Sequence, residues 1–164
     1  MVSSLGHKSY IYHGGYGYRK RLCESVSSWF ITKYFPRHKL EIEIFHRGLK
    51  REGVVGWCDM IGPDHRPREF LIELDTYMDE ELYTRTLLHE LIHVKQWVDR
   101  SLTYSNQHRY FKSVNVDEMD YEDQPHEIEA QEKEKELLDE YKREIEELKE
   151  KAKQINRSVP RHLL

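Results

Sequence analysis

The apolar residues in the first half of the chain follow a helical pattern and then an alternating one. Between residues 18 and 34 they recur every three or four positions, and Pro36 ends the segment, which predicts a helix. Residues 40–45 alternate between apolar and polar, as a half-buried strand does, and residues 53–61 and 70–74 are predicted to form two further strands. We therefore expect an α+β fold, with an N-terminal helix and a small, mostly antiparallel three-stranded sheet.

A second helical period runs from about Glu80 to Asp99, and the Asp79 side chain can cap its first turn. The apolar positions gather on one side of this helix, which should face the sheet. They are Leu87, Leu88, Leu91, Val94 and Val98. His89 and His93 lie about 40° apart on roughly the opposite side, since an α-helix turns about 100° per residue. The pattern predicts a helix with an apolar back and two imidazoles on its front.

Residues 100–125 show no clear period and are rich in Tyr, Asn, Ser and Asp, so we expect a long connection there. A second long helix, highly charged, is predicted over residues 126–156, after Pro125. It carries a narrow apolar stripe with alternating spacings of three and four. The stripe consists of Leu138, Tyr141, Ile145, Leu148, Ala152 and Ile155. Such a stripe is typical of a solvated helix laid along a domain and also of a short coiled coil between two copies, so monomer and dimer both stay open.

The length of 164 residues suits one compact domain and is too short for two. Residues 1–17 are rich in Gly and Tyr, and their apolar positions follow neither the helical nor the strand period. This predicts an irregular N-terminal arm. Residues 18–156 are expected to form the single domain, with the long charged helix included. Residues 157–164 are expected to be a tail.

Charge is distributed unevenly within the net charge of −4. Residues 1–70 carry 12 Lys and Arg against 7 Asp and Glu, whereas residues 71–164 carry 14 against 23. The acidic excess suits a solvated C-terminal helix. The basic first half could contact nucleic acid or an acidic partner.

Composition excludes several classes of protein. No run of about 18 apolar residues is present, so we expect no membrane-spanning segment. The N-terminus lacks the apolar block of a secretory signal. Two cysteines, Cys23 and Cys58, are too few for a disulfide framework or an all-cysteine zinc site. They suit a reducing compartment, and we expect a cytoplasmic protein.

His89, Glu90 and His93 form an H-E-x-x-H motif on the second predicted helix. Residues four apart on a helix face the same way, about 6 Å from one another, so both ring nitrogens can reach one zinc ion. Glu90 is offset around the helix, outside the metal's reach, where it can take a proton from a metal-activated water. The motif predicts one Zn2+ per chain, with His89 and His93 as ligands and Glu90 as general base.

A catalytic zinc site needs a third protein ligand, which we expect to be Glu127. Glu127 lies in the first turn of the second long helix, and Ala130 on the same face would let two helices approach closely. His108 and His126 stay open as alternatives. Glu129 points about 200° away from Glu127 and is expected to face outward.

These residues resemble the motif of the gluzincin zinc metallopeptidases. The likeness consists of His89-Glu90-x-x-His93 after a short sheet, followed by Glu127-x-x-Ala130 on a later helix. The small size and the order of elements are similar to the minigluzincins, the minimal members of that class. They are also similar to SprT-like metallopeptidases, including phage-encoded ones, in which the third ligand is usually a histidine.

The resemblance covers roughly residues 20–140 and implies zinc-dependent hydrolysis of a peptide or protein substrate. It also implies that an extended peptide lies against the predicted strand 70–74 as an edge strand. A donor from Tyr, His or Arg should face the scissile carbonyl oxygen. The candidates in the connection are Tyr104, His108, Tyr110 and Tyr121.

Two alternative functions remain open at this level. The first is a zinc-binding module without catalysis, which the presence of Glu90 disfavours, because a purely structural site needs no base. The second is a DNA-associated protein of the SprT-like kind that docks through its basic N-terminal half. We also expect that the tail after Asn156 could fold back over the site and make it latent.

Overall fold

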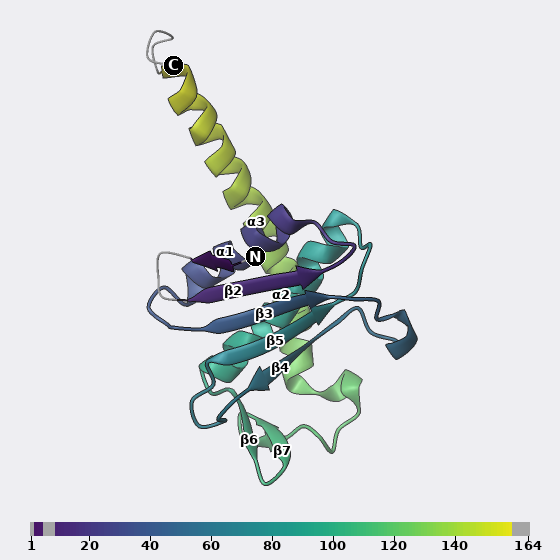
Figure 1. The fold of residues 1–164 in the computed structure, drawn as a ribbon. Helices are drawn as coiled ribbons and strands as arrows, with labels where there is room; N and C mark the ends of the chain where they lie inside the picture. Colours follow the sequence, from purple (N-terminus) through teal and green to yellow (C-terminus); the bar gives the residue numbers. More distant parts are fainter. Residues whose placement is uncertain (1, 5–8, 159–164) are drawn as a thin grey trace.

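Five strands form the main sheet of the computed structural model, which describes residues 2–4 and 9–158 (Figure 1). Their order across the sheet is β1 (Val2–Ser4), β2 (Tyr10–Gly15), β3 (Glu41–His46), β5 (Glu69–Leu74) and β4 (Gly56–Ile61). The pairs β2–β3 and β3–β5 are parallel, whereas β1–β2 and β4–β5 are antiparallel. Strand β4 is therefore an edge of this sheet, with one side of its backbone unpaired by any strand of the sheet.

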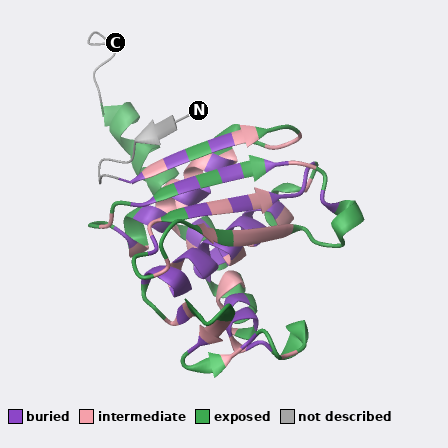
Figure 2. Ribbon diagram, turned by 60° about the horizontal axis from the view of Figure 1, so that its bottom comes forward, coloured by how far each residue is buried: buried purple, intermediate pink, exposed green. Residues whose placement is uncertain are grey.

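All three long helices lie on one side of the main sheet (Figure 1). They are α1 (Lys20–Tyr34), α2 (Glu80–Val98) and α3 (Pro125–Ser158). The other face of the sheet is open, and burial alternates along its strands (Figure 2). In β3, Ile42 and Ile44 are fully buried toward the helices, whereas Glu41 and Glu43 are exposed. The core therefore lies between the sheet and α1 and α2.

A second, antiparallel sheet and a short helical turn occupy much of the segment between α2 and α3. The sheet consists of β6 (Leu102–Ser105), β7 (His108–Phe111) and β8 (Val114–Asn115). The strands are joined by two-residue turns in which both central residues have positive φ, as in type I′ hairpins. The short helical turn is η2 (Tyr121–Asp123), just before α3. A similar helical turn, η1 (Lys50–Glu52), lies in the β3–β4 connection. The connection predicted over residues 100–125 thus contains a hairpin that folds beside the main sheet.

The α+β fold class is confirmed, and so are the three predicted helices and three predicted strands. The expectation of an irregular arm over residues 1–17 is wrong, because β1 and β2 extend the main sheet. In β2, Ile11 and His13 face the core, but the adjacent glycines and tyrosines hide this short alternation in the sequence. The main sheet is consequently larger than expected and partly parallel, since α1 connects β2 to β3 as a crossover helix.

The expected edge at residues 70–74 is also wrong. Strand β5 lies between β3 and β4, so both sides of its backbone are paired. Parallel pairing with β3 makes it an inner strand, and Phe70, Ile72 and Leu74 are buried on its core face. The edge next to α2 is β4 instead.

Helix α3 packs on the domain only as far as Ile145. Tyr141 on α3 hydrogen-bonds Ser25 of α1, and the Glu144 carboxylate accepts from the Trp29 indole of α1 at 2.6 Å. Residues 146–158 are all exposed, and Figure 1 shows this half of α3 projecting beyond the domain. The apolar stripe is therefore divided into a buried and an exposed part, and a dimer through the exposed part stays a prediction. In the described part of the chain, no helix is both long and apolar enough to cross a membrane.

Helix α3 continues to Ser158, so residues 157 and 158 belong to this helix and not to the expected tail. Residues 159–164 lie outside the described residues. The hypothesis of a tail that covers the site falls on them and stays a prediction.

His46 is a fully buried titratable group at the end of β3. Its Nδ1 donates a hydrogen bond to the Gly14 carbonyl oxygen (2.7 Å), and its Nε2 accepts one from the Tyr83 hydroxyl (2.8 Å). The ring also stacks on Tyr18 with 3.6 Å between centroids. Burial lowers the pKa of His46 to about 4, although the hydrogen bond to Gly14 opposes this shift.

Acidification from pH 7 to pH 5 should destabilise the protein through His46. Because its folded-state pKa lies below the unfolded value of about 6.5, the unfolded chain binds the proton first. The contribution of neutral His46 to the free energy of unfolding is therefore fully present above pH 6.5 and is lost as the pH falls toward 4. Between pH 7 and pH 5 the free energy of unfolding should fall by about 2 kcal/mol. Urea unfolding at both pH values should show this loss in wild type and a smaller one in His46→Gln. The exposed His65→Gln should behave as wild type, and equal pH dependence in wild type and His46→Gln would contradict the argument.

Candidate metal centre

Helix α2 holds the two histidines because its other side is anchored in the core. It begins at Asp79, whose carboxylate accepts a hydrogen bond from the Leu82 backbone N–H at 2.8 Å, so the predicted cap is confirmed. Its predicted apolar positions are buried against the sheet and α1. Burial of this side turns His89 and His93 toward α3, and both rings point the same way along the helix.

Helix α3 brings the third residue into place. Pro125 occupies its first position, where a missing N–H costs nothing and the fixed φ suits a helix start. Glu127 follows within the first turn and is buried, facing α2. Ala130 is fully buried, and α2 and α3 pack closely, as the sequence analysis predicted.

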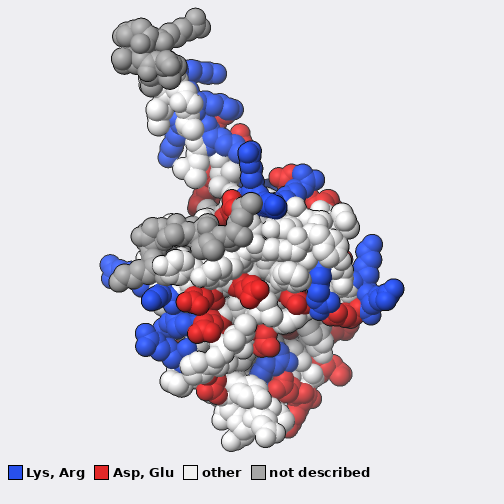
Figure 3. Space-filling model, viewed as in Figure 1, with Lys and Arg blue, Asp and Glu red and all other residues white. Residues whose placement is uncertain are grey.

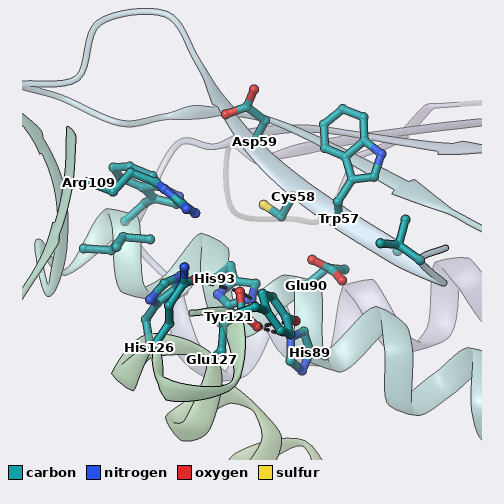
Figure 4. Close-up of a pocket in the computed structure, with 15 residues that line it drawn as sticks. Trp57, Cys58, Asp59, His89, Glu90, His93, Arg109, Tyr121, His126 and Glu127 are labelled. Atoms are coloured by element: carbon teal, nitrogen blue, oxygen red, sulfur yellow. Dashed lines mark hydrogen bonds and ion pairs between the residues drawn. The ribbon is translucent and has the colours of Figure 1, made fainter. Parts of the chain in front are cut away.

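The side chains of His89, His93 and Glu127 converge on one point (Figure 4). Nε2 of His89 lies 3.2 Å from Nε2 of His93 and 3.2 Å from Oε2 of Glu127, and Nε2 of His93 lies 3.4 Å from Oε1 of Glu127. Ligand atoms bound tetrahedrally at about 2.0–2.1 Å are about 3.3 Å apart, so these separations suit a zinc-sized ion. This cluster could bind a metal ion.

Two further side chains orient the imidazoles. The carboxylate of Glu134, two turns along α3 from Glu127, lies 2.6 Å from Nδ1 of His89. The amide oxygen of Gln96 lies 2.8 Å from Nδ1 of His93. Both acceptors favour a proton on Nδ1, which leaves Nε2 of each ring to face the shared point, the tautomer that a metal ligand needs. Gln96 in turn donates to the His126 carbonyl oxygen and to Glu129, which ties α2 to α3.

The carboxylates make this cluster strongly favourable for a cation. Burial alone lowers the pKa of His89, but hydrogen bonds with Glu127 and Glu134 outweigh it and raise the pKa to about 10. Burial alone would raise the pKa of Glu127, but its contacts with His89 and His93 and a hydrogen bond from Tyr121 lower it well below its usual range. Glu127 is therefore ionised at any physiological pH, as a metal ligand must be.

Glu90 sits beside the cluster in a different environment. Its side chain is buried, and desolvation raises its pKa to about 7 even though the two neighbouring histidines oppose the shift. Strand β4 leaves room for it at Gly56, where a Cβ atom would lie 3.0 Å from Oε1 of Glu90. A carboxyl group with a pKa near neutrality can both accept and donate a proton at physiological pH.

A pocket of about 290 Å³ lies over the cluster, between β4 and the helices (Figure 4). Trp57, Cys58 and Asp59 on β4 form one wall. The opposite wall is formed by α2 and the start of α3, and residues of the second sheet and around η2 complete the lining. These residues are Leu102 of β6, Arg109 of β7, Tyr121 of η2 and Gln124, which directly follows η2.

The structure separates the alternatives for the third ligand. His108 is exposed at the tip of the β6–β7 hairpin, where it pairs with Ser105 and has no part in the cluster. His126 is buried beside the cluster, with its Nε2 3.5 Å from Oε1 of Glu127, but its ring is not among the converging atoms. Glu129 is partly buried and held by Gln96 and Lys133, so it does not simply face outward as predicted.

One of the four predicted carbonyl-facing donors lies at the cluster. The Tyr121 hydroxyl donates to Oε2 of Glu127 at 2.8 Å, and its ring lines the pocket. Tyr104, His108 and Tyr110 do not line it.

Glu134 and Arg109 are among the residues of the site that the sequence analysis missed. Glu134 could have been found, because it lies seven residues after Glu127 and hence on the same side of α3. Arg109 could not have been found, because its place in the pocket depends on the unforeseen hairpin. Comparison of the chain with protein-family models, with curated proteins and with solved structures found no match.

We expect the purified protein to bind about one zinc ion per chain and Glu127→Ala to lose it on dialysis, because two histidines alone make an incomplete site. His108→Ala should retain the ion, since its side chain lies outside the cluster. Mass spectrometry of metal content on the three proteins measures this directly. Zinc retained by Glu127→Ala and lost by His108→Ala would refute the assignment.

Removal of the Glu134 carboxylate should weaken metal binding without removing a ligand. Loss of the acceptor on Nδ1 of His89 lets the ring rotate and change tautomer, which typically costs about 10–100-fold in affinity. Competition with a fluorescent chelator should show this for Glu134→Ala. The matched control Glu136→Ala changes an exposed glutamate of the same helix and should bind as wild type does. Equal affinity in the two variants would exclude an orienting role for Glu134.

Proposed function

We propose that this protein is a zinc-dependent metallopeptidase. The observation that carries the proposal is the convergence of His89, His93 and Glu127 at the floor of a pocket, with the buried carboxyl group of Glu90 beside them. Two imidazoles and one carboxylate form the donor set of many catalytic zinc sites, in which a fourth position is left for the reacting groups.

Zinc is the ion that these donors favour. Magnesium and calcium prefer six or more oxygen ligands, whereas two of the three donors here are imidazole nitrogens. A zinc ion at this point would polarise a scissile carbonyl group and lower the pKa of a coordinated water to about 7. One ion per chain suffices for this chemistry.

Glu90 is the group that we assign to proton transfer. Its pKa of about 7 matches a role in which it accepts a proton from the attacking water and later gives it to the leaving amine. Because Gly56 has no side chain, β4 passes close over this carboxyl group without displacing it.

The edge position of β4 supports an extended peptide as the substrate. The unpaired backbone groups of an edge strand can hydrogen-bond a chain laid beside them, and this strand forms one wall of the pocket. The role that the resemblance assigned to residues 70–74 is thus transferred to residues 56–61.

Tyr121 is the donor that we favour for the scissile carbonyl oxygen. Its hydroxyl lies beside the cluster, where it donates to Glu127, and its ring lines the same pocket.

Two alternatives are less well supported. In a zinc module without catalysis, a buried carboxyl group with a raised pKa beside the cluster would have no purpose and would cost stability. For DNA docking, a continuous basic surface would be needed. On the face shown in Figure 3, Lys and Arg side chains are interspersed with Asp and Glu.

Glu90→Gln is the decisive variant for the proposal. We expect it to lower kcat/KM for peptide hydrolysis by at least about 100-fold, since general base catalysis contributes 10²–10⁴-fold, while zinc content stays at one per chain. Glu81→Gln, an exposed change on the same helix, is the matched control. The assay is cleavage of a mixed peptide library, followed by mass spectrometry. Wild type that holds zinc but cleaves no peptide would refute the proposal.

A further inference from the structure

Arg109 is held in one orientation by a neighbouring acid. Its backbone N–H and its side-chain Nε both donate to the carboxylate of Asp117, each at 2.7 Å. Asp117 is fixed in turn through its own backbone N–H, which donates to the side-chain oxygen of Asn115. The base of the guanidinium is therefore anchored on the hairpin side of the pocket.

The outer end of the same guanidinium, formed by the two Nη atoms, makes no hydrogen bond to the described residues. An arginine has five N–H donors, and Asp117 takes only the one on Nε. The Nη atoms have no hydrogen-bond partner among the described residues, and 38% of the side chain is exposed. In Figure 4 this end points into the pocket toward Cys58 of β4, and the His126 ring lies below it. Two parallel N–H groups arranged in this way match the two oxygens of a carboxylate.

The charges around the pocket point to the same ligand. Its charged lining includes the acids Asp59, Glu90 and Glu127, and Arg109 is the one Lys or Arg side chain among the described lining residues. A peptide carboxylate placed beside Asp59 would meet like charge. At Arg109 it would find two donors whose orientation is already set, so little entropy is lost on binding.

We propose that Arg109 is a substrate-binding residue that receives a carboxylate of the peptide, either an acidic side chain or the free C-terminus. This inference rests on the proposed function, since it places the substrate in the same pocket. Asp117 acts on the substrate only through Arg109 and is a positioning residue. The contact with Asp117 alone would explain a structural role for Arg109. It leaves the four Nη protons without an acceptor, however, and these are the donors that a carboxylate would accept from.

The test measures binding and not cleavage, so that it is independent of the chemistry. Zinc-loaded full-length Glu90→Gln protein is titrated with fluorescent peptides of one sequence, in which each position in turn is Glu or Gln and the C-terminus is amidated. A second arm compares a neutral peptide with a free C-terminal carboxylate against its amide. The first arm detects a side-chain carboxylate and the second a terminal one.

We expect at least one carboxylate peptide to bind about tenfold or more tightly than its neutral partner, because a hydrogen-bonded charge pair is made. This ratio should fall to about one when Arg109→Gln is added. The ratio should fall only in part for Arg109→Lys, because lysine keeps the positive charge but lacks the two parallel N–H donors. The exposed Arg21→Gln on α1 should leave the ratio unchanged. A merely structural role of Arg109 would weaken both peptides of a pair alike.

Each outcome decides a separate point. Pairs that bind equally, a preference that persists in Arg109→Gln, or no peptide binding at all would overturn the inference. Cleavage by wild type without a carboxylate preference would overturn this inference alone. A carboxylate preference lost in Arg109→Gln, in a protein whose wild type cleaves nothing, would retain the carboxylate site and refute the peptidase.

Discussion

The close contact between α2 and α3 is the constraint on which the candidate site depends. Helix α2 has no freedom to rotate, because its leucines and valines are buried against the sheet. Its histidines must therefore face α3, and fully buried Ala130 lets that helix approach. Two anchored helices then hold the two imidazoles and the Glu127 carboxylate within 3.2–3.4 Å of one another without help from a flexible loop. A site built on rigid elements keeps its geometry before any ligand binds.

Three glutamates in this small region have different environments and hence different properties. Glu127 faces both imidazoles and a phenol, so its pKa is lowered, and it is suited to a permanent negative charge. Glu134 contacts the outer nitrogen of His89 and, with its other oxygen, Arg85, and it acts on the cluster through the His89 ring. Glu90 has no hydrogen bond to either imidazole, and burial raises its pKa to about 7. Pairs of acids whose environments separate their pKa values in this way are typical of sites that use one as ligand and another as proton carrier.

The two sheets have distinct parts in the pocket. The main sheet provides β4, whose edge is the natural place for an extended chain, and the glycine that makes room for Glu90. The small sheet carries Arg109 to the other side of the same pocket. Under the proposed function, the peptide backbone and the carboxylate would be contacted by elements far apart in the sequence. The motif helix lies between these elements.

Local periodicity was enough to determine the helices, the H-E-x-x-H motif and its orientation away from the core, because a helix repeats within a few residues. The position of Glu127 and Ala130 on one face extended this to the third residue of the cluster. Strand β2, the inner position of β5 and the edge position of β4 could not be determined in that way, because strand order depends on pairings between residues far apart in the chain. Arg109 belongs to the same group, since a hairpin had to fold against the domain before its guanidinium could face the pocket. The sequence by itself thus determined which residues can hold a metal ion, and only the tertiary structure decided what surrounds it, since contacts distant in sequence leave no local period.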